Sequence, residues 1–202
     1  MAQIRKNGIA SRNVRTERDR NRCAMHVFFR FVSSLLRKDL ETDSLDAVKA
    51  FTQSDVDREL YVAMPVGFAI AGYCLKLLKA LEGIKQGSYL WFQKNKWAWN
   101  KCGCYADLIE PTLYTHEKLR IIIAVFADDV GAGYKKAIET DWLRIRNEYS
   151  KLIVIDSPGP ETIVPVTKFT GVNIERNRAA RTLRRALGQP VQRDQAPQAR
   201  SS

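Results

Sequence analysis

The sequence predicts a mixed α+β fold, and three observations support this prediction. Residues 121–127 form a short apolar run rich in β-branched side chains, which is typical of a buried strand and far too short to cross a bilayer. Two adjacent carboxylates, Asp128 and Asp129, follow this run before the chain returns to apolar character, which is the pattern of a tight hairpin. Apolar residues recur at helical spacing in residues 23–37 and 134–149, which predicts two packed helices.

Extended patterns follow the first predicted helix. Residues 45–48 can carry a short strand, with Asp46 at or near its end. An aspartate is costly to bury without a partner, so Asp46 is a candidate ligand, although an ordinary exposed strand end explains the local pattern equally well. Residues 60–64 predict another strand, which ends at Pro65.

Residues 89–101 predict a helix that carries most of the tryptophan of the chain among lysines. Its aromatic positions are Trp91, Phe92, Trp97 and Trp99. Such a face belongs to a core more often than it forms a platform for stacked bases, so we expect these rings to be core. Further along, a Pro- and Gly-rich break at residues 157–160 precedes the last predicted strand, residues 168–174.

The adjacent aspartates at the predicted hairpin tip raise a question of charge. Asp128 and Asp129 repel each other and resist desolvation, so a positive group should lie beside them. Mg²⁺ is a hard cation that prefers carboxylate oxygen and is the natural candidate. A polar hairpin turn is the simpler interpretation, and the pair taken alone favours it. The second candidate upstream, Asp46, is what shifts the balance towards a site.

Charge is concentrated at the ends of the chain. The formal net charge is +11, and residues 1–22 and 176–202 account for all of it, which leaves a neutral body. Basic ends on a neutral body suit contact with a polyanion, most often nucleic acid. Solubilising, disordered ends are the alternative, and beyond Gly188 the composition favours it because almost nothing there can be buried.

The four cysteines do not suggest a disulfide framework in a chain of 202 residues. The start of the chain is basic and polar, without the apolar segment of a signal peptide. We therefore expect an intracellular protein, cytoplasmic or nuclear and not secreted, that does not associate with membranes. Cys102 and Cys104 are too closely spaced for an ordinary zinc pair, so we do not expect a zinc site.

Several motifs, taken together and in order, resemble the reverse transcriptase of copia-type retrotransposons, closest to the forms found in fungi. These motifs are Asp46-Ala-Val-Lys-Ala-Phe51, Glu59-Leu-Tyr-Val-Ala-Met-Pro-Val-Gly-Phe68, Leu78-Lys-Ala-Leu-Glu-Gly-Ile-Lys-Gln86, Glu110-Pro-Thr-Leu-Tyr114, Phe126-Ala-Asp-Asp129 and Phe169-Thr-Gly-Val-Asn-Ile-Glu-Arg176. The resemblance extends from about Phe29 to Leu183. Each motif is weak alone, and the ordered series is specific.

The resemblance implies a polymerase palm, an antiparallel sheet with packed helices. Composition and the resemblance together predict three segments: a basic, poorly ordered N-terminal segment (1–22), the palm domain (23–183) and a basic disordered tail (184–202). The resemblance also implies an RNA template, a DNA primer and deoxynucleotides as partners. Incomplete fingers and no thumb are expected, as in a fragment of a larger polyprotein. Nothing in the sequence indicates an oligomeric state.

The resemblance also implies roles for single residues. Asp46 and Asp128 would bind two catalytic Mg²⁺ or Mn²⁺ ions, and Asp129 would support them as the second residue of the pair. Phe51 would crowd the sugar 2′-position of the incoming nucleotide, and Gln86 would help to hold that nucleotide. Three further residues lie in a segment that resembles the one gripping the primer end: Phe169, Gly171 and Val172.

This chain departs from the family pattern near the predicted site. Phe126 and Ala127 replace the usual Tyr-Val before the aspartates, and Glu82 stands at an aromatic position. Three hypotheses follow: a reverse transcriptase domain with weak or no activity as an isolated chain, a non-catalytic nucleic-acid binder descended from one, and a basic globular protein whose motifs arose by chance. The ordered series argues against the third.

Overall fold

The computed structural model describes residues 17–156, 158–159, 161–178 and 182–186. Within them the helices are α1 (Glu17–Lys38), α2 (Gly87–Lys101) and α3 (Glu139–Ser150), with single 3₁₀ turns η1 (Ala50–Gln53) and η2 (Lys136–Ile138). The strands are β1 (Glu41–Ala47), β2 (Tyr61–Val62), β3 (Leu75–Lys76), β4 (Cys104–Ala106), β5 (Leu113–His116), β6 (Ile122–Phe126), β7 (Asp129–Tyr134), β8 (Ile155–Asp156), β9 (Lys168–Phe169), β10 (Val172–Asn177) and β11 (Thr182–Ala186). The predicted α+β class is confirmed.

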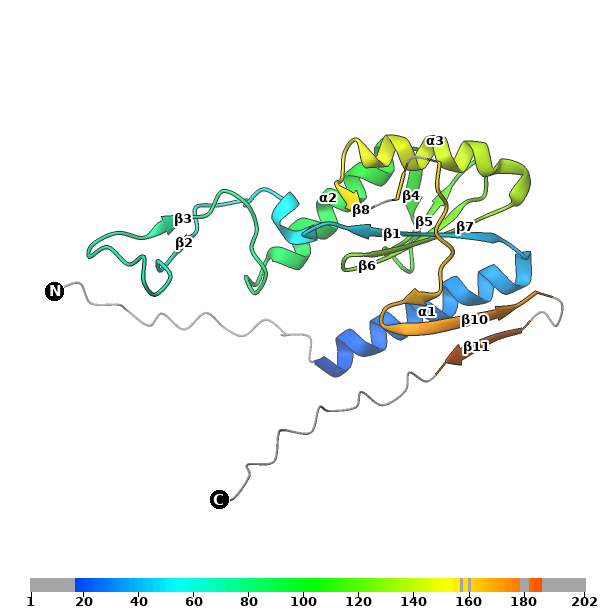
Figure 1. Ribbon diagram of the computed structural model, residues 1–202, viewed down its shortest axis with the longest axis horizontal. Helices are drawn as coiled ribbons and strands as arrows, with labels where there is room; N and C mark the ends of the chain where they lie inside the picture. The colour runs from blue at the N-terminus through cyan, green and yellow to red at the C-terminus, as the bar shows by residue number, and fades with distance from the viewer. Residues whose placement is uncertain (1–16, 157, 160, 179–181, 187–202) are drawn as a thin grey trace, which may run out of the picture.

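A six-stranded antiparallel sheet forms the centre of the fold, in the order β4-β5-β6-β7-β1-β8. Helices α2 and α3 cover one face, while α1 and a small sheet of order β11-β10-β9 cover the other (Figure 1). Because both faces are covered, the residues of β6 from Ile122 to Val125 are all buried, which explains their continuous apolar character.

The face under α2 and α3 holds the larger hydrophobic core. Trp99 is fully buried and stacks on Tyr149 of α3, with ring centroids 3.8 Å apart. Trp91 and Trp142 are also buried there. The prediction that the tryptophan-rich helix faces a core is confirmed for Trp91 and Trp99, whereas Trp97 is 48% exposed.

The opposite face explains the glycines that follow the aspartate pair. A Cβ atom on Gly131 would lie 2.9 Å from Phe31 Cε1, and one on Gly133 would lie 2.5 Å from Leu35 Cδ2. Both distances are shorter than a carbon–carbon contact allows, so β7 needs glycine where α1 crosses it. The close approach of α1 and β7 fixes one strand of the hairpin that carries the candidate site.

Two sequence-based boundaries need correction. Helix α1 begins at Glu17, six residues before the predicted start and inside the segment expected to be poorly ordered. Tyr134, predicted as the first residue of a helix, ends β7 and pairs with Glu41, and α3 begins at Glu139. The apolar pattern could not place this boundary, because Tyr134 is buried against Trp142 and so continues the periodicity of the helix.

The last predicted strand, residues 168–174, is two strands. Thr170 and Gly171 both have positive φ, at 51° and 75°, and form a two-residue turn between β9 and β10. The prediction was wrong here because only Gly171 marks the turn in the sequence and Thr170 is a poor residue for a left-handed conformation. Strand β11 was not predicted, and residues 1–16 and 187–202 of the predicted basic ends lie outside the described residues.

Residues 54–86 form an arm that extends from the body beside α2 (Figure 1). Its only strands, β2 and β3, pair over two residues each, so the predicted strand at residues 60–64 is short. Large apolar side chains on the arm are exposed, among them Val66, Phe68 and Tyr73. In the part of the chain that the structure describes, each helix is too short or too polar to cross a membrane.

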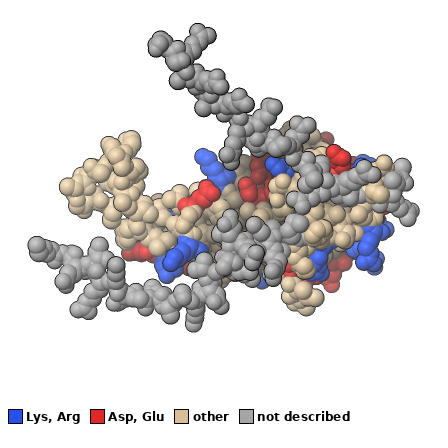
Figure 2. Space-filling model, turned by 90° about the horizontal axis from the view of Figure 1, so that it is seen from below, with Lys and Arg blue, Asp and Glu red and all other residues tan. Residues whose placement is uncertain are grey.

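Two arginines of the basic C-terminal segment bind the body of the fold. Arg176 donates to the Leu40 carbonyl and forms a 2.6 Å ion pair with Asp39. Arg178 binds both carboxylate oxygens of Glu41. On the face drawn in Figure 2, basic and acidic side chains lie interspersed. The sequence analysis counted Arg176 and Arg178 among the charges available to nucleic acid. In the structure they instead bind the end of β10 to the junction between α1 and β1.

Candidate active site

The hairpin between β6 and β7 turns over two residues, Ala127 and Asp128. Phe126 pairs with Asp129 across the hairpin, so Asp129 is the first residue of β7. The sequence had suggested that Asp129 lies in the turn with Asp128, and this was wrong. Ala127 has a φ of 52° and Asp128 has no positive φ, the pattern of a type II′ turn. Glycine normally fills the first position, and alanine there hid the register from sequence inspection.

The turn is held from both sides. The Trp91 indole donates a 2.6 Å hydrogen bond to the Ala127 carbonyl, which ties α2 to the turn. The Ala47 amide donates a 3.0 Å hydrogen bond to the Asp128 carbonyl, which ties the end of β1 to it. These two bonds hold the backbone of Asp128 beside Ala47, the residue that follows Asp46.

Three predicted site residues, Asp46, Asp128 and Asp129, come together at this edge. Asp46 and Asp129 are opposite each other in the β1–β7 pair, so their side chains project from the same face of the sheet. Partial burial raises the pKa of Asp46, and the negative charges of Asp128 and Asp156 raise it further. The sequence placed Asp46 and the pair 82 residues apart, and the fold makes them neighbours.

Asp129 is the most enclosed of the three carboxylates. Its Oδ2 accepts a 3.0 Å hydrogen bond from the Thr170 amide in the turn between β9 and β10. Burial raises the pKa of Asp129, with repulsion from Asp128 and Asp46 adding to the rise, while the Thr170 amide and the nearby Lys168 oppose it. Asp129 thus links the catalytic-type aspartates to the segment that resembles a primer grip.

Asp156 is a fourth carboxylate that sequence reasoning missed. It pairs with Asp46 on the other side of β1 and is exposed. Strand β8 is only two residues long and ends at the Pro- and Gly-rich break. The one local signal was an aspartate directly after the apolar residues Ile153 to Ile155, a pattern shared with Asp46 and the pair.

The donor set fits a hard divalent cation. Across the described ranges, no ion pair involves Asp46, Asp128, Asp129 or Asp156. Neighbouring carboxylates without a cationic partner repel, and Mg²⁺ or Mn²⁺ relieves this repulsion through oxygen ligands. Among the same residues, no group of three carboxylate, His or Cys side chains is already gathered as metal ligands. Binding of an ion therefore requires these side chains to close in.

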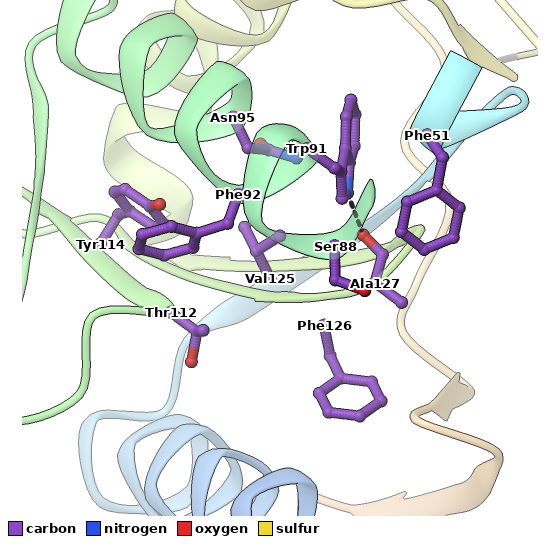
Figure 3. A pocket seen from close by; sticks show the side chains of 10 residues that line it. All are labelled: Phe51, Ser88, Trp91, Phe92, Asn95, Thr112, Tyr114, Val125, Phe126 and Ala127. Carbon is purple, nitrogen blue, oxygen red and sulfur yellow. Dashed lines mark hydrogen bonds between the residues drawn. The ribbon is translucent and has the colours of Figure 1, made fainter. Parts of the chain in front are cut away.

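Phe51 lies in η1, close to the turn, and its contact with a nucleotide stays a prediction. It lines a pocket of about 450 Å³ together with Trp91, Phe126 and Ala127 (Figure 3). A Cβ atom on Gly87, the residue after Gln86, would lie 3.2 Å from the Leu81 carbonyl oxygen and 3.3 Å from Ile84 Cγ1, which is tighter than most Cβ contacts, and 3.8 Å from the Phe51 ring, which is an ordinary contact.

Gln86 directly precedes α2, and its side chain makes no hydrogen bond to the end of that helix but is bonded elsewhere in the chain. Its Oε1 accepts a 2.8 Å hydrogen bond from Arg58, and its Nε2 donates a 3.2 Å hydrogen bond to Asp57. Gln86 does not line the pocket that contains Phe51. Contact between Gln86 and a nucleotide would therefore replace the bonds to the base of the arm.

The residues predicted to grip the primer are mostly core residues. Phe169 is 1% exposed and packs on Phe31, with ring centroids 5.5 Å apart, and Val172 is also buried. Gly171 is exposed at the turn, where a Cβ atom would meet nothing within 4 Å. Within residues 169–172, only the turn at Thr170 and Gly171 is thus open to a primer. The buried side chains of Phe169 and Val172 hold this turn in place.

The site lies inside the part of the chain that matches a known family. Residues 33–186 match the family described as reverse transcriptase (RNA-dependent DNA polymerase). The chain is similar to the retrovirus-related Pol polyprotein from transposon TNT 1-94 of Nicotiana tabacum, at 29% identity over 153 residues. That match covers 72% of this chain and 11% of the polyprotein, so the chain spans about a tenth of its relative. No solved structure matches the chain. Because the family match covers most of the chain, including every predicted site residue, the chain belongs to the reverse transcriptases, in their copia-type form.

Proposed function

We propose that this chain is the palm domain of a copia-type RNA-directed DNA polymerase, with residues 23–183 as the domain. The observation that supports this most directly is the grouping of Asp46, Asp128 and Asp129, none of which forms an ion pair within the described residues, beside a turn whose backbone is hydrogen-bonded to α2 and β1. Asp46 and Asp128 are exposed and so are open to an ion from solvent, and the repulsion among neighbouring like charges is relieved when a cation binds.

In this proposal Asp46 and Asp128 hold the metal ions. Divalent ions bound there would lower the pKa of the primer 3′-hydroxyl and stabilise the charge that grows on the transferred phosphorus. Asp129 stays hydrogen-bonded to the Thr170 amide and so holds the turn beside the ligands. Phe51, at the mouth of the neighbouring pocket, crowds the sugar 2′-position and favours deoxynucleotides. The RNA template, the DNA primer and the deoxynucleotides are the partners.

Replacement of one ligand tests the proposal. Asp128→Asn is expected to lower magnesium-dependent primer extension by at least about a hundredfold, because a ligating charge that stabilises the transition state is lost. The assay uses an RNA template with a DNA primer, at enzyme concentrations high enough to detect slow single additions. Asp141→Asn is the matched control, since Asp141 is a half-buried aspartate in the first turn of α3 that pairs with Arg144 and lies outside the candidate site.

Three outcomes separate the hypotheses. Extension that Asp128→Asn abolishes and Asp141→Asn keeps supports the polymerase. Equal extension by both variants contradicts the assignment of Asp128. Absence of extension in the unmodified chain, with affinity for an RNA–DNA hybrid retained, supports the alternative of a non-catalytic nucleic-acid-binding relative.

The basic ends provide a test of the nucleic-acid partner. Removal of residues 1–16 and 187–202 deletes arginine and lysine without touching any described element. Affinity for an RNA–DNA hybrid is expected to fall, and its dependence on salt concentration to flatten, because fewer phosphates are neutralised. Fluorescence anisotropy at several salt concentrations measures both quantities. Unchanged affinity and an unchanged salt slope would place the contact on the neutral body.

A further inference from the structure

One side chain, Gln53, fastens the short turn η1 to the segment that leads into β8. Its Nε2 donates hydrogen bonds to the Val154 carbonyl at 2.9 Å and to the Val48 carbonyl at 2.7 Å. Its Oε1 accepts a 2.8 Å hydrogen bond from the Val154 amide. Both donors and the acceptor of this side-chain amide are therefore engaged with the backbone, and we call these three bonds the Gln53 clamp.

The bonds between Gln53 and Val154 reproduce the pairing of two strand residues. In an antiparallel ladder, the residues of a hydrogen-bonded pair exchange both N–H···O=C bonds. Strand β1 does not supply such a partner for Val154, because the chain turns at Lys49, which has a left-handed φ of 48°. The side-chain amide of Gln53 takes the place of the missing peptide group. It thereby extends a β1–β8 ladder that has only two residue pairs of its own.

The clamp also determines where the rest of η1 lies. Phe51 is two residues before Gln53 in this turn and lines the pocket beside Ala127 (Figure 3). On the other side of η1, the Lys94 Nζ donates a 2.7 Å hydrogen bond to the Gln53 carbonyl and so ties the turn to α2. A 3₁₀ turn of four residues has few and poorly aligned hydrogen bonds of its own. The place of the Phe51 ring therefore depends on how Gln53 is held.

The aspartate edge is coupled to the same clamp. Strand β8 consists of Ile155 and Asp156 alone, and Asp156 is opposite Asp46 in the β1–β8 pair. Val154 directly precedes this strand, and its carbonyl also accepts a 3.0 Å hydrogen bond from the Val48 amide. The bonds from Gln53 thus hold β8 in register beside the end of β1. One side chain connects the turn that carries Phe51 with the strand end that carries Asp46.

We propose that Gln53 is a positioning residue that sets the place of Phe51 and thereby the preference for deoxynucleotides over ribonucleotides. The inference rests on the polymerase function proposed above, in which Phe51 crowds the sugar 2′-position. Gln53 acts through Phe51 and not on the nucleotide, because its own amide is occupied by the backbone of Val48 and Val154. Without the clamp, η1 moves and space for a 2′-hydroxyl opens beside the ring.

Single-nucleotide addition by the full chain, with a DNA primer on an RNA template, tests the proposal. The measured quantity is the ratio of kcat/KM for a deoxynucleotide to kcat/KM for the matching ribonucleotide. Gln53→Met keeps the length of the side chain but removes all three hydrogen bonds, and should lower this ratio by about tenfold. A general loss of stability would lower both kcat/KM values together and keep their ratio.

Two further variants sharpen this test. Gln53→Glu has the size of the natural side chain but lacks the two N–H donors, so it should lower the ratio in the same direction as Gln53→Met. Gln93→Met is the matched control, since Gln93 is an exposed glutamine of α2, and it should leave the ratio unchanged. A ratio in Gln53→Glu and Gln53→Met equal to that of the unmodified chain would overturn the proposal.

A double-mutant cycle shows whether Gln53 acts through Phe51. Phe51→Ala removes the ring and should itself lower the ratio. Gln53→Met should then have no further effect, because the ring that it positions is absent. An equal effect of Gln53→Met with and without the Phe51 ring would contradict a positioning role.

Two NMR measurements need no polymerase activity. Solvent exchange of the Val154 backbone amide should be at least about fivefold faster in Gln53→Met than in the unmodified chain, because the acceptor of that amide is lost. The ¹H–¹³C signals of the Phe51 ring should shift in Gln53→Met and stay unchanged in Gln93→Met. Unchanged signals of the Phe51 ring in Gln53→Met would overturn the proposal.

The two proposals can fail separately. Absence of nucleotide addition by the unmodified chain would count against the polymerase function and the preference that rests on it, whereas a shift of the Phe51 ring signals would still support the positioning role. Nucleotide addition with an unchanged ratio and unchanged ring signals in Gln53→Met would contradict the role of Gln53 and leave the polymerase function in place.

Discussion

Two aspartates of the same strand, three residues apart, have opposite surroundings. Asp43 is fully buried under α3 and accepts hydrogen bonds from the Val164 amide and the Trp142 indole, each at 2.9 Å. The Arg146 guanidinium lies 3.3 Å from the same carboxylate. Asp46 projects from the other face of β1, where its charged neighbours are Asp128 and Asp156, which are also negative.

The difference separates a structural carboxylate from a candidate ligand. Burial raises the pKa of Asp43, but three neutral donors (the Val164 amide, the Trp142 indole and the Ser44 amide) and the charge of Arg146 oppose the rise. No cation opposes the rise at Asp46. Arg146 also donates to the carbonyls of Thr162 and Gly159, so the Asp43 network fastens the segment that leads to β9. One aspartate thus holds the fold together, and the other is left available for an ion.

The largest expected effect is on the paired carboxylate. Arg146→Met leaves Asp43 buried without its cation and should lower the free energy of unfolding by about 3–5 kcal/mol. Arg144→Met, on the same helix, breaks an exposed ion pair with Asp141 and should cost less than about 1 kcal/mol. Urea denaturation followed by circular dichroism measures both. Equal losses of unfolding free energy for the two variants would contradict the structural role given to the Asp43–Arg146 pair, on which the contrast with Asp46 rests.

A smaller effect, on the pH dependence of the free energy of unfolding, is expected at the candidate site. The pKa values of Asp46 and Asp129 are raised in the folded state, so the folded chain binds more protons than the unfolded chain just above the ordinary carboxyl pKa. The contribution of these two groups to stability without metal should therefore fall as the pH rises from the ordinary value of 3.8 through the raised values. Asp129→Asn removes one of these groups and should make the fall shallower.

Urea midpoints between about pH 4 and pH 6.5, in buffer with a metal chelator, measure this slope. Asp141→Asn serves again as the control and should keep the slope of the unmodified chain. A fall that is just as steep in Asp129→Asn as in the unmodified chain would show that repulsion within the aspartate group does not limit stability.

Sequence reasoning located the elements that carry the site because buried strands have a strong local signal. The apolar run before Asp128 is β6, as expected, and the short strand predicted at residues 45–48 is part of β1, which begins four residues earlier at Glu41 and ends at Ala47. Their pairing through β7 is long-range, and the resemblance to a family supplied that information. The local sequence pattern alone did not decide whether Asp46 is a metal ligand or an ordinary residue at an exposed strand end.

The features that sequence reasoning missed depend on contacts between distant segments. Asp43 and Arg146 are 103 residues apart, and nothing in either local pattern marks them as partners. Asp156 joins the site only because β8 pairs with β1. The buried position of Phe169 follows from its contact with Phe31, which lies on a helix far away in the sequence.

The central claim is that Asp46, Asp128 and Asp129 form a site for divalent ions, and calorimetric titration of the full chain with Mn²⁺ tests it most directly. The account predicts saturable binding that Asp128→Asn weakens by at least about tenfold, because a charged oxygen ligand is lost. Asp141→Asn should bind as the unmodified chain does. Equal Mn²⁺ affinity in Asp128→Asn and Asp141→Asn would contradict the claim, and the aspartate pair would then be a polar hairpin turn.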